Sequence, residues 1–295
     1  MHPKIIALVG PTASGKSSLA IRLAKTLQGE IVSADSRQVY RGLDIGSGKV
    51  SKREQRGARH HLLDIANPKN RYTVAHFVRD GKHALNDILQ RGKLPIVVGG
   101  TGFWIDALLR GESIPSVPPN PELRKRLAKL SVQKLYAALK KLDPRRAATI
   151  DRHNPVRLIR ALEIFQTTGK PIPPRTSKTN NEILWLGVRM GKKKLHQRIH
   201  RRLQQRLRVG MVAETQRLLE QGVPAKQLIA FGLEYRYCTW LLQKKLSRAQ
   251  FEKQLEREIQ HYAKRQLTWF QRHKDIHWVT SAAMASRVAQ KFLQA

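Results

Sequence analysis

A phosphate-binding loop pattern, G-x-x-x-x-G-K-[ST], lies near the start of the chain. It is formed by Gly10, Pro11, Thr12, Ala13, Ser14, Gly15, Lys16 and Ser17. The glycines let the backbone curl so that successive N–H groups point at an anion, and the start of a helix adds a partial positive charge. Lys16 supplies a mobile cation, and the Ser17 hydroxyl can bind a magnesium ion. Because this pattern arises by chance in roughly one chain of this length in a hundred, we predict a phosphate-binding site rather than a plain glycine-rich turn.

The segments on either side of this loop have the patterns of a strand and a helix. Ile5 to Val9 are apolar, which is typical of a buried strand, and Ser18 to Leu27 has leucines four apart, which predicts a helix. A second run, Glu30 to Asp35, predicts a strand that ends at a carboxylate. Open α/β sheets bind ligands at the carboxyl ends of their strands, so we expect Asp35 to share a crevice with the phosphate loop. The neighbours expected there are Ser36, Arg37, Gln38 and Tyr40.

Three roles are open to Asp35 at this position: metal ligand, general base, or cap of a following helix. The next loop, Asp44 to Lys49, is rich in glycine, but its composition does not indicate chemistry. His60 and His61 are adjacent, so they point to opposite sides of a strand and lack the spacing of a metal-ligand pair. We therefore expect them to pack or to form hydrogen bonds.

A helix and a third strand are predicted next. Thr73 can cap a helix whose apolar residues recur at helical spacing as far as Gly92. The apolar run Pro95 to Val98 then predicts a buried strand, which ends in Gly99-Gly100-Thr101-Gly102. Glycines at a strand end favour a close approach of the backbone to a ligand.

From Pro115 the chain is rich in proline, and helical patterns then follow one another to Thr168 without a strand-like run. We therefore predict an α/β fold with a P-loop NTPase-like core and a mainly parallel central sheet, formed by residues 1–112 and 183–295. A smaller helical insertion, residues 113–182, interrupts it. The residues expected to cap or open the inserted helices are Asn120, Ser131, Asp143 and Asn154, and Gly169 is expected to end the last one.

A basic helix is predicted after a further strand at Ile183 to Val188. Lys192 to Arg208 contains eight Lys or Arg residues and no acidic residue. Arg198, Arg202 and Arg206 are four apart and therefore lie on one face. Because a solvated face mixes both signs of charge, this stripe indicates an anion opposite it. A later helix mixes polar and cationic side chains with aromatic rings, which suits a nucleic-acid strand although aromatics alone are more often core. Its residues are Tyr262, Lys264, Arg265, Gln266, Trp269, Phe270 and Arg272.

The composition points to a polyanionic partner. Among 295 residues, 56 Lys or Arg stand against 21 Asp or Glu, a formal net charge of +35. Nucleic acid is favoured over an acidic membrane, because no apolar segment approaches about 20 residues. The single cysteine excludes an internal disulfide and a cysteine zinc site. The first predicted strand follows Met1 almost directly, which leaves no room for a signal peptide, so we expect a cytoplasmic protein.

Seven segments resemble the tRNA dimethylallyltransferases, also called tRNA isopentenyltransferases, and together they span nearly the whole chain. They are GPTASGKS at 10–17, DSRQVYRGLDIG at 35–46, HHLLDI at 60–65, VGGTGFW at 98–104, NPVRLIRALEIF-x-x-TG at 154–169, LHQRI at 195–199 and YAKRQLTWF at 262–270.

The resemblance implies transfer of a dimethylallyl group from dimethylallyl diphosphate to N6 of adenosine 37, next to the tRNA anticodon, giving N6-isopentenyladenosine and diphosphate. The phosphate loop would bind the donor's diphosphate rather than ATP, with Mg²⁺ at Ser17. Asp35, Arg202 and Thr12 would form the catalytic set, with Asp35 as the general base and Arg202 on the diphosphate. The residues that would contact the anticodon stem-loop are Asp35, Ser36, Arg37, Gln38, Thr101, Val156, Arg157, Leu158, Ile159 and Arg160.

Two departures from the family pattern limit what is carried over. Gly232-Leu233-Glu234 stands where many relatives have Gly-Tyr and a polar residue, and the zinc finger of larger eukaryotic relatives is absent, so we expect no zinc. We expect the chain to act as a monomer, without a membrane partner. Two alternatives use other chemistry: a small-molecule or nucleoside kinase with ATP in the same loop, and a non-catalytic RNA-binding protein. A kinase has no evident use for the positive charge, and a pure binding protein has none for an intact Lys16 and Ser17.

Overall fold

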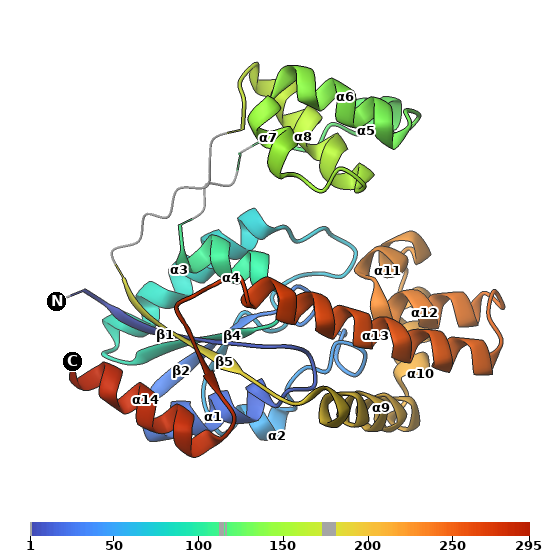
Figure 1. Cartoon of the computed structure of the whole chain (residues 1–295). Helices are drawn as coiled ribbons and strands as arrows, with labels where there is room; N and C mark the ends of the chain where they lie inside the picture. The colour runs from blue at the N-terminus through green and yellow to red at the C-terminus, as the bar shows by residue number, and fades with distance from the viewer. Residues whose placement is uncertain (1, 112–114, 116, 173–180) are drawn as a thin grey trace. The chain divides into compact units, whose positions relative to one another are not determined.

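Figure 1 shows the computed structural model of the chain, which describes residues 2–111, 115, 117–172 and 181–295. The chain divides into two compact units, Met1–Arg110 with Thr179–Ala295, and Gly111–Lys178. The first unit is built on a single sheet and the second is helical. The predicted α/β class, with a phosphate loop and a parallel sheet, is confirmed.

Parallel strands form the sheet, in the order β3-β2-β4-β1-β5-β6. β1 and β4 are neighbours in the sheet. The chain leaves β1 toward β2, on the β3 side of the sheet, and it leaves β4 toward β5, on the β6 side. A crevice therefore opens between the carboxyl ends of β1 and β4, which is where ligands bind in open α/β sheets. The strands are β1 (Lys4–Val9), β2 (Gly29–Ala34), β3 (His60–His61), β4 (Leu94–Gly99), β5 (Glu182–Val188) and β6 (Ile276–Val279).

Helices cover both faces of this sheet (Figure 1). On one face, α1 (Lys16–Thr26) and α14 (Ala282–Gln294) pack against alternate strand residues such as Ile6 and Leu8. On the other face, α3 (Val74–Gln90) and α4 (Gly102–Leu109) pack against the intervening strand residues, such as Ile5 and Ala7. The central strands are therefore buried on both sides, which is why their sequences are continuous apolar runs. A short helix, α2 (Lys52–Gln55), lies between β2 and β3.

A cluster of helices extends from the sheet at its carboxyl edge. It consists of α9 (Lys192–Val209), α10 (Met211–Glu220), α11 (Ala225–Phe231), α12 (Leu233–Leu242) and α13 (Arg248–Phe270). The apolar stripe of α9 packs against that of α13 and is buried; the residues are Leu195, Ile199, Leu203, Phe251, Leu255 and Ile259. The arginine-bearing stripe of α9 lies next to this buried stripe and lines the cavity beside the phosphate loop.

The helical unit contains α5 (Pro121–Leu127), α6 (Val132–Leu142), α7 (Pro144–Thr149) and α8 (Pro155–Thr168). Each predicted cap is confirmed: a side-chain oxygen accepts a hydrogen bond from the N–H three residues later, and Gly169 ends α8 with φ of 66°. The capping residues are Asn120, Ser131, Asp143 and Asn154. Within the described ranges of the chain, no helix is long and apolar enough to cross a membrane.

Candidate active site

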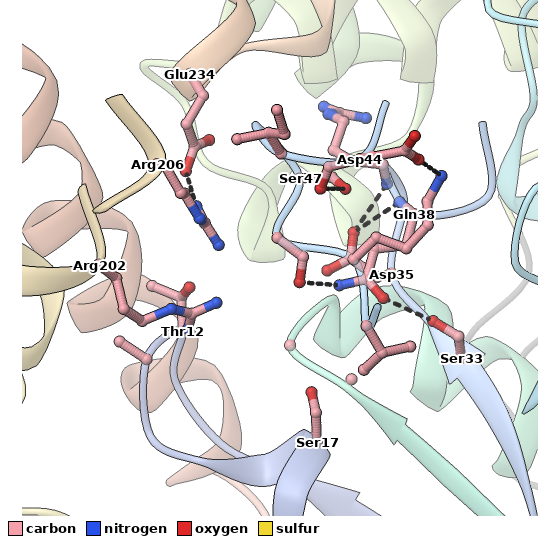
Figure 2. Close-up of a pocket in the computed structure, with 18 of the residues that line it drawn as sticks. Thr12, Ser17, Ser33, Asp35, Gln38, Asp44, Ser47, Arg202, Arg206 and Glu234 are labelled. Atoms are coloured by element: carbon pink, nitrogen blue, oxygen red, sulfur yellow. Dashed lines mark hydrogen bonds and ion pairs between the residues drawn. The ribbon is translucent and has the colours of Figure 1, made fainter. Parts of the chain in front are cut away.

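A cavity of about 880 Å³ opens at the carboxyl ends of the strands. The phosphate loop forms one wall and the segment after β2 forms another. The end of β4 and residues of α9, α11, α12 and α13 also line the cavity. Figure 2 shows Thr12, Ser17, Arg202 and Asp35 around the same opening. The structure thus brings the phosphate loop and the predicted catalytic carboxylate, which are separated by a helix and a strand in the sequence, into one cavity.

The phosphate loop adopts a backbone that its glycines permit. Gly10 and Gly15 have φ of 146° and 96°, in the region that favours glycine. The Lys16 ammonium donates a hydrogen bond to the carbonyl of Pro11 at 2.7 Å. Burial lowers the pKa of Lys16 to about 7, and the positive charge of Arg202 contributes to the shift. An anion bound in the loop would reverse the effect of Arg202, and it would therefore favour the charged ammonium.

Three arginines of α9 face the phosphate loop across the cavity: Arg198, Arg202 and Arg206. A Cβ placed on Gly15 would lie 3.4 Å from Nη2 of Arg198, so this guanidinium packs directly over the start of α1. Burial, and to a smaller extent the charge of Arg206, lower the pKa of Arg202 to about 10. The basic stripe expected from the sequence therefore gathers positive charge beside the phosphate loop, which suits a polyvalent anion.

Asp35 follows β2, and its side chain organises the next turn. Its Oδ1 accepts hydrogen bonds from the N–H groups of Arg37 at 2.8 Å and of Gln38 at 3.4 Å. No hydrogen bond from the described residues engages its Oδ2, so this oxygen is available to take a proton. Tyr262 faces Asp35 from α13: burial and then the charge of Asp35 raise the pKa of Tyr262 to about 12.

The neighbours of Asp35 divide into cavity and core residues. Ser36, Arg37 and Gln38 line the cavity, and the Ser36 N–H donates to the hydroxyl of Thr101 at 3.4 Å. The expectation for Tyr40 is wrong. Its ring is buried against Phe231, with 4.7 Å between centroids, because the turn after β2 carries it back into the core.

Gln266 on α13 links two sides of the cavity. Its Oε1 accepts a hydrogen bond from the Thr12 N–H at 2.7 Å, and its Nε2 donates to the carbonyl of Gly100 at 2.9 Å. A Cβ on Gly100 would lie 2.1 Å from this Nε2, and one on Gly102 would lie 2.2 Å from the ring of Trp269. Gly100 and Gly102 are therefore required by α13. Gly99 and Gly100 also line the cavity, so the expected close approach to a ligand stays a prediction.

The histidine pair after α2 forms hydrogen bonds, as expected. Nε2 of His61 lies 2.7 Å from a carboxylate oxygen of Glu30, and Nδ1 of His60 lies 2.7 Å from the carbonyl of Ala58. In the parts of the chain that the structure describes, no three His, Cys, Asp or Glu side chains are grouped to hold a metal ion.

Comparison with known proteins assigns the family. The IPP transferase family model matches residues 38–273, and an isopentenyl transferase model matches residues 3–69. The tRNA dimethylallyltransferase of Thermomicrobium roseum is 44% identical over 93% of this chain and 85% of its own length. A tRNA dimethylallyltransferase of Trichlorobacter lovleyi is 42% identical over 99% of this chain and 100% of its own. The chain belongs to the tRNA dimethylallyltransferase family.

Solved structures agree with this assignment. The full-length tRNA isopentenylpyrophosphate transferase of Bacillus halodurans superposes with a TM-score of 0.75 at 33% identity, covering 99% of this chain and 97% of that one. A eukaryotic dimethylallyltransferase acting on tRNA superposes with a TM-score of 0.83 at 25% identity, covering 99% and 80%. As in other members of the family, the activity is that of a transferase.

The family's remaining expected tRNA contacts lie on α8 of the helical unit. Val156 is 75% exposed and Arg157 is exposed, whereas the Arg160 guanidinium is bound to Glu163 and to the carbonyl of Val117. The expectation for Leu158 needs correction, because its side chain is fully buried in the core of this unit. A helix turns by 100° per residue, which places Leu158 with Ala161 and Leu162 and away from Val156. Ile159 is partly buried against the same core.

Several residues that shape the site could not be found from the sequence. Glu214 is buried on α10, and its carboxylate accepts hydrogen bonds from the N–H groups of residues 44, 45 and 46 at 3.0, 2.7 and 3.0 Å. Tyr235 donates to the same carboxylate at 2.9 Å. Gln266 stands in the YAKRQLTWF segment of the family pattern, but the sequence assigned no role to its side chain, and Glu214 stands in none of the seven segments. The stripe of arginines was a signal for Arg206, whose partner is Glu234.

Proposed function

We propose that this chain transfers the dimethylallyl group of dimethylallyl diphosphate to N6 of adenosine 37 of tRNA, giving N6-isopentenyladenosine and diphosphate. The observation that carries this proposal is the shared cavity, which holds a phosphate loop and three arginines on one side of the reacting centre and Asp35 on the other. A kinase has no evident use for the net charge of +35. The names of the relatives support the same reaction.

The diphosphate end of the pocket stabilises a leaving group. Cleavage of the allylic carbon–oxygen bond leaves negative charge on diphosphate, and the loop N–H groups, Lys16 and Arg202 supply opposite charge where it develops. Lys16 has a pKa of about 7 before an anion binds, so the developing charge draws it into its protonated form. Thr12 lies in the loop between these groups, with its N–H fixed by Gln266.

The Asp35 end of the pocket accepts a proton. The lone pair of the adenine amine is delocalised into the ring, so the nitrogen becomes a better nucleophile as its proton leaves. The free Oδ2 of Asp35 suits this step, while Oδ1 is held by the Arg37 and Gln38 N–H groups. General-base assistance of this kind contributes about 10²–10⁴-fold to the rate.

A magnesium ion fits the donor atoms at the head of α1. The Ser17 hydroxyl faces the cavity beside the phosphate loop, and Mg²⁺ prefers oxygen ligands from hydroxyl groups and phosphates. Ser17 is thus the side chain that would hold the ion together with the diphosphate oxygens. Bound there, the ion offsets part of the charge that develops on diphosphate.

The acceptor fits the exposed basic surface of the protein. A purine stacked in an RNA loop must leave its stack to reach Asp35 inside the cavity. We propose that the anticodon stem-loop contacts Asp35 to Gln38 and Thr101 in the core, and Val156, Arg157 and Arg160 in the helical insertion. The insertion, predicted as residues 113–182 and found as the compact unit Gly111–Lys178, is then an RNA-binding domain. The proposed enzyme is a monomer that works in the cytoplasm.

One reaction tests the proposal. Purified protein is incubated with unmodified tRNA, Mg²⁺ and dimethylallyl diphosphate, and the nucleosides are analysed by mass spectrometry. The proposal expects one added prenyl group on the adenosine 3′ of the anticodon, and none when the donor is replaced by ATP. Phosphate transfer from labelled ATP, or an unmodified tRNA under all conditions, would contradict it.

A further inference from the structure

Arg206 is held by a carboxylate that no part of the proposed reaction uses. Its Nη1 lies 3.0 Å from Oε1 of Glu234 and donates to the carbonyl of Gly46 at 3.3 Å. The two side chains are only 15% and 14% exposed. Figure 2 shows Arg206 between Glu234 and the phosphate-loop side of the cavity. In the described part of the chain, this is the one ion pair formed by Arg198, Arg202 or Arg206.

The loop Asp44 to Lys49 is shaped to receive two guanidinium groups. A Cβ on Gly48 would lie 1.7 Å from Nη2 of Arg206 and 2.9 Å from Nη2 of Arg202, so any other residue there would displace both. Gly48 has φ of 62°, which also favours glycine. Glu214 fixes this loop through three backbone hydrogen bonds. Two positive charges therefore converge on one glycine in a rigid loop.

We propose that Glu234 is a positioning residue that holds Arg206 against this loop and offsets its charge, so that the pocket can release the product diphosphate. The inference rests on the proposed function, since it assumes that diphosphate occupies the phosphate loop. Lys16, Arg198 and Arg202 already face that anion. A fourth free cation would strengthen binding of substrate and product alike, which does not raise the rate of the chemical step and slows product release.

The variant E234Q tests this directly. It removes one negative charge near a polyvalent anion and frees Arg206 to turn toward it, so inorganic diphosphate should bind more tightly, on the order of tenfold by calorimetry. Product inhibition by diphosphate should strengthen by a similar factor, and kcat should fall while KM for the donor also falls. A purely structural ion pair predicts the opposite, because its loss would loosen the pocket and weaken binding.

Two further variants complete the experiment. The double variant R206Q/E234Q removes both charges, and its affinity for diphosphate should return to within about threefold of the wild type, since the net charge is restored. The control is E256Q, which removes a carboxylate of α13 that does not line the cavity and lies 2.8 Å from Nδ1 of the exposed His200 on α9. E256Q should leave diphosphate binding unchanged.

The outcomes separate this inference from the proposed function. If the wild type does not bind inorganic diphosphate, the proposed function fails. If the wild type binds it and E234Q binds it equally or more weakly, this inference alone fails. Should E234Q not fold, E234D supplies the same test, because retracting the carboxylate by one methylene loosens its hold on Arg206. E234D should then bind diphosphate about two- to threefold more tightly, and an unchanged dissociation constant would overturn the inference.

Discussion

Gln266 offers a sharp test of how the phosphate loop is held. It is 6% exposed, and it joins the Thr12 N–H to the Gly100 carbonyl, which lie 254 and 166 residues earlier in the chain. The substitution Q266L keeps most of the volume of the side chain and removes both hydrogen bonds. The loop and the end of β4 then lose their common link to α13.

The expected magnitude follows from the two groups left unpaired. A buried donor or acceptor without a partner costs about 1–3 kcal/mol, and the gain from the apolar leucine offsets part of that cost. We therefore expect Q266L to lower the free energy of unfolding by about 2–4 kcal/mol, which for a unit of this size lowers Tm by roughly 5–15 °C. Binding of inorganic diphosphate should weaken by about tenfold, because a cost of about 1.4 kcal/mol for reordering the loop corresponds to that factor.

Thermal unfolding and calorimetry with diphosphate measure both effects. The matched control is Q254L, since Gln254 lies on the same helix but is exposed. Q254L should change Tm by less than about 2 °C, the usual range for an exposed substitution. If Q266L behaved like Q254L in both measurements, the proposed link between α13 and the phosphate loop would be refuted.

Two predictions concern buried charges. Burial raises the pKa of Glu163, but hydrogen bonds from Arg124, the Asn120 N–H and Arg160 outweigh it and bring the pKa to about 2. E163Q should therefore lower the free energy of unfolding of the helical unit by about 2–4 kcal/mol near neutral pH. In the wild type, protonation of Glu163 lowers stability as the pH falls from 4.5 to 2, and E163Q should lack this contribution to the pH dependence. Equal denaturation curves for the two proteins would contradict this. Diphosphate binding at pH 7.5 should take up a proton at Lys16, whose pKa of about 7 an anion raises. Calorimetry in buffers of different ionisation enthalpy measures this uptake, and K16M should abolish it; no buffer dependence in the wild type would count against the account.

Most of the core and part of the site could be predicted from the sequence because their signals are local. The strands β1, β2, β4 and β5 are apolar runs, and the phosphate loop and the arginine stripe of α9 are recognisable from spacing alone. The edge strand β6 and the helices α10, α11, α12 and α14 were not predicted. β6 has only four residues, and a short mixed segment such as Ile276–Val279 does not distinguish strand from loop.

Most of what the sequence did not reveal depends on contact between segments far apart in the chain. The glycines after β4 have the same sequence whether a ligand or a side chain approaches them, and only the fold shows that Gln266 and Trp269 do so. Glu214, Glu234 and Gln266 act through partners more than 25 residues away. Leu158 was misjudged for a different reason: its motif was transferred as a block, although successive residues of a helix face different ways.

The central claim is that Asp35 takes the proton from an adenine amine while the phosphate loop holds the leaving group. The variant D35N tests it most directly, because asparagine keeps an oxygen for the Arg37 and Gln38 N–H groups but cannot act as the base. Single-turnover prenylation of tRNA should slow by about 10²–10⁴-fold, while the dissociation constant for tRNA stays within about threefold of the wild type. A D35N enzyme that prenylates tRNA at the rate of the wild type would contradict the account.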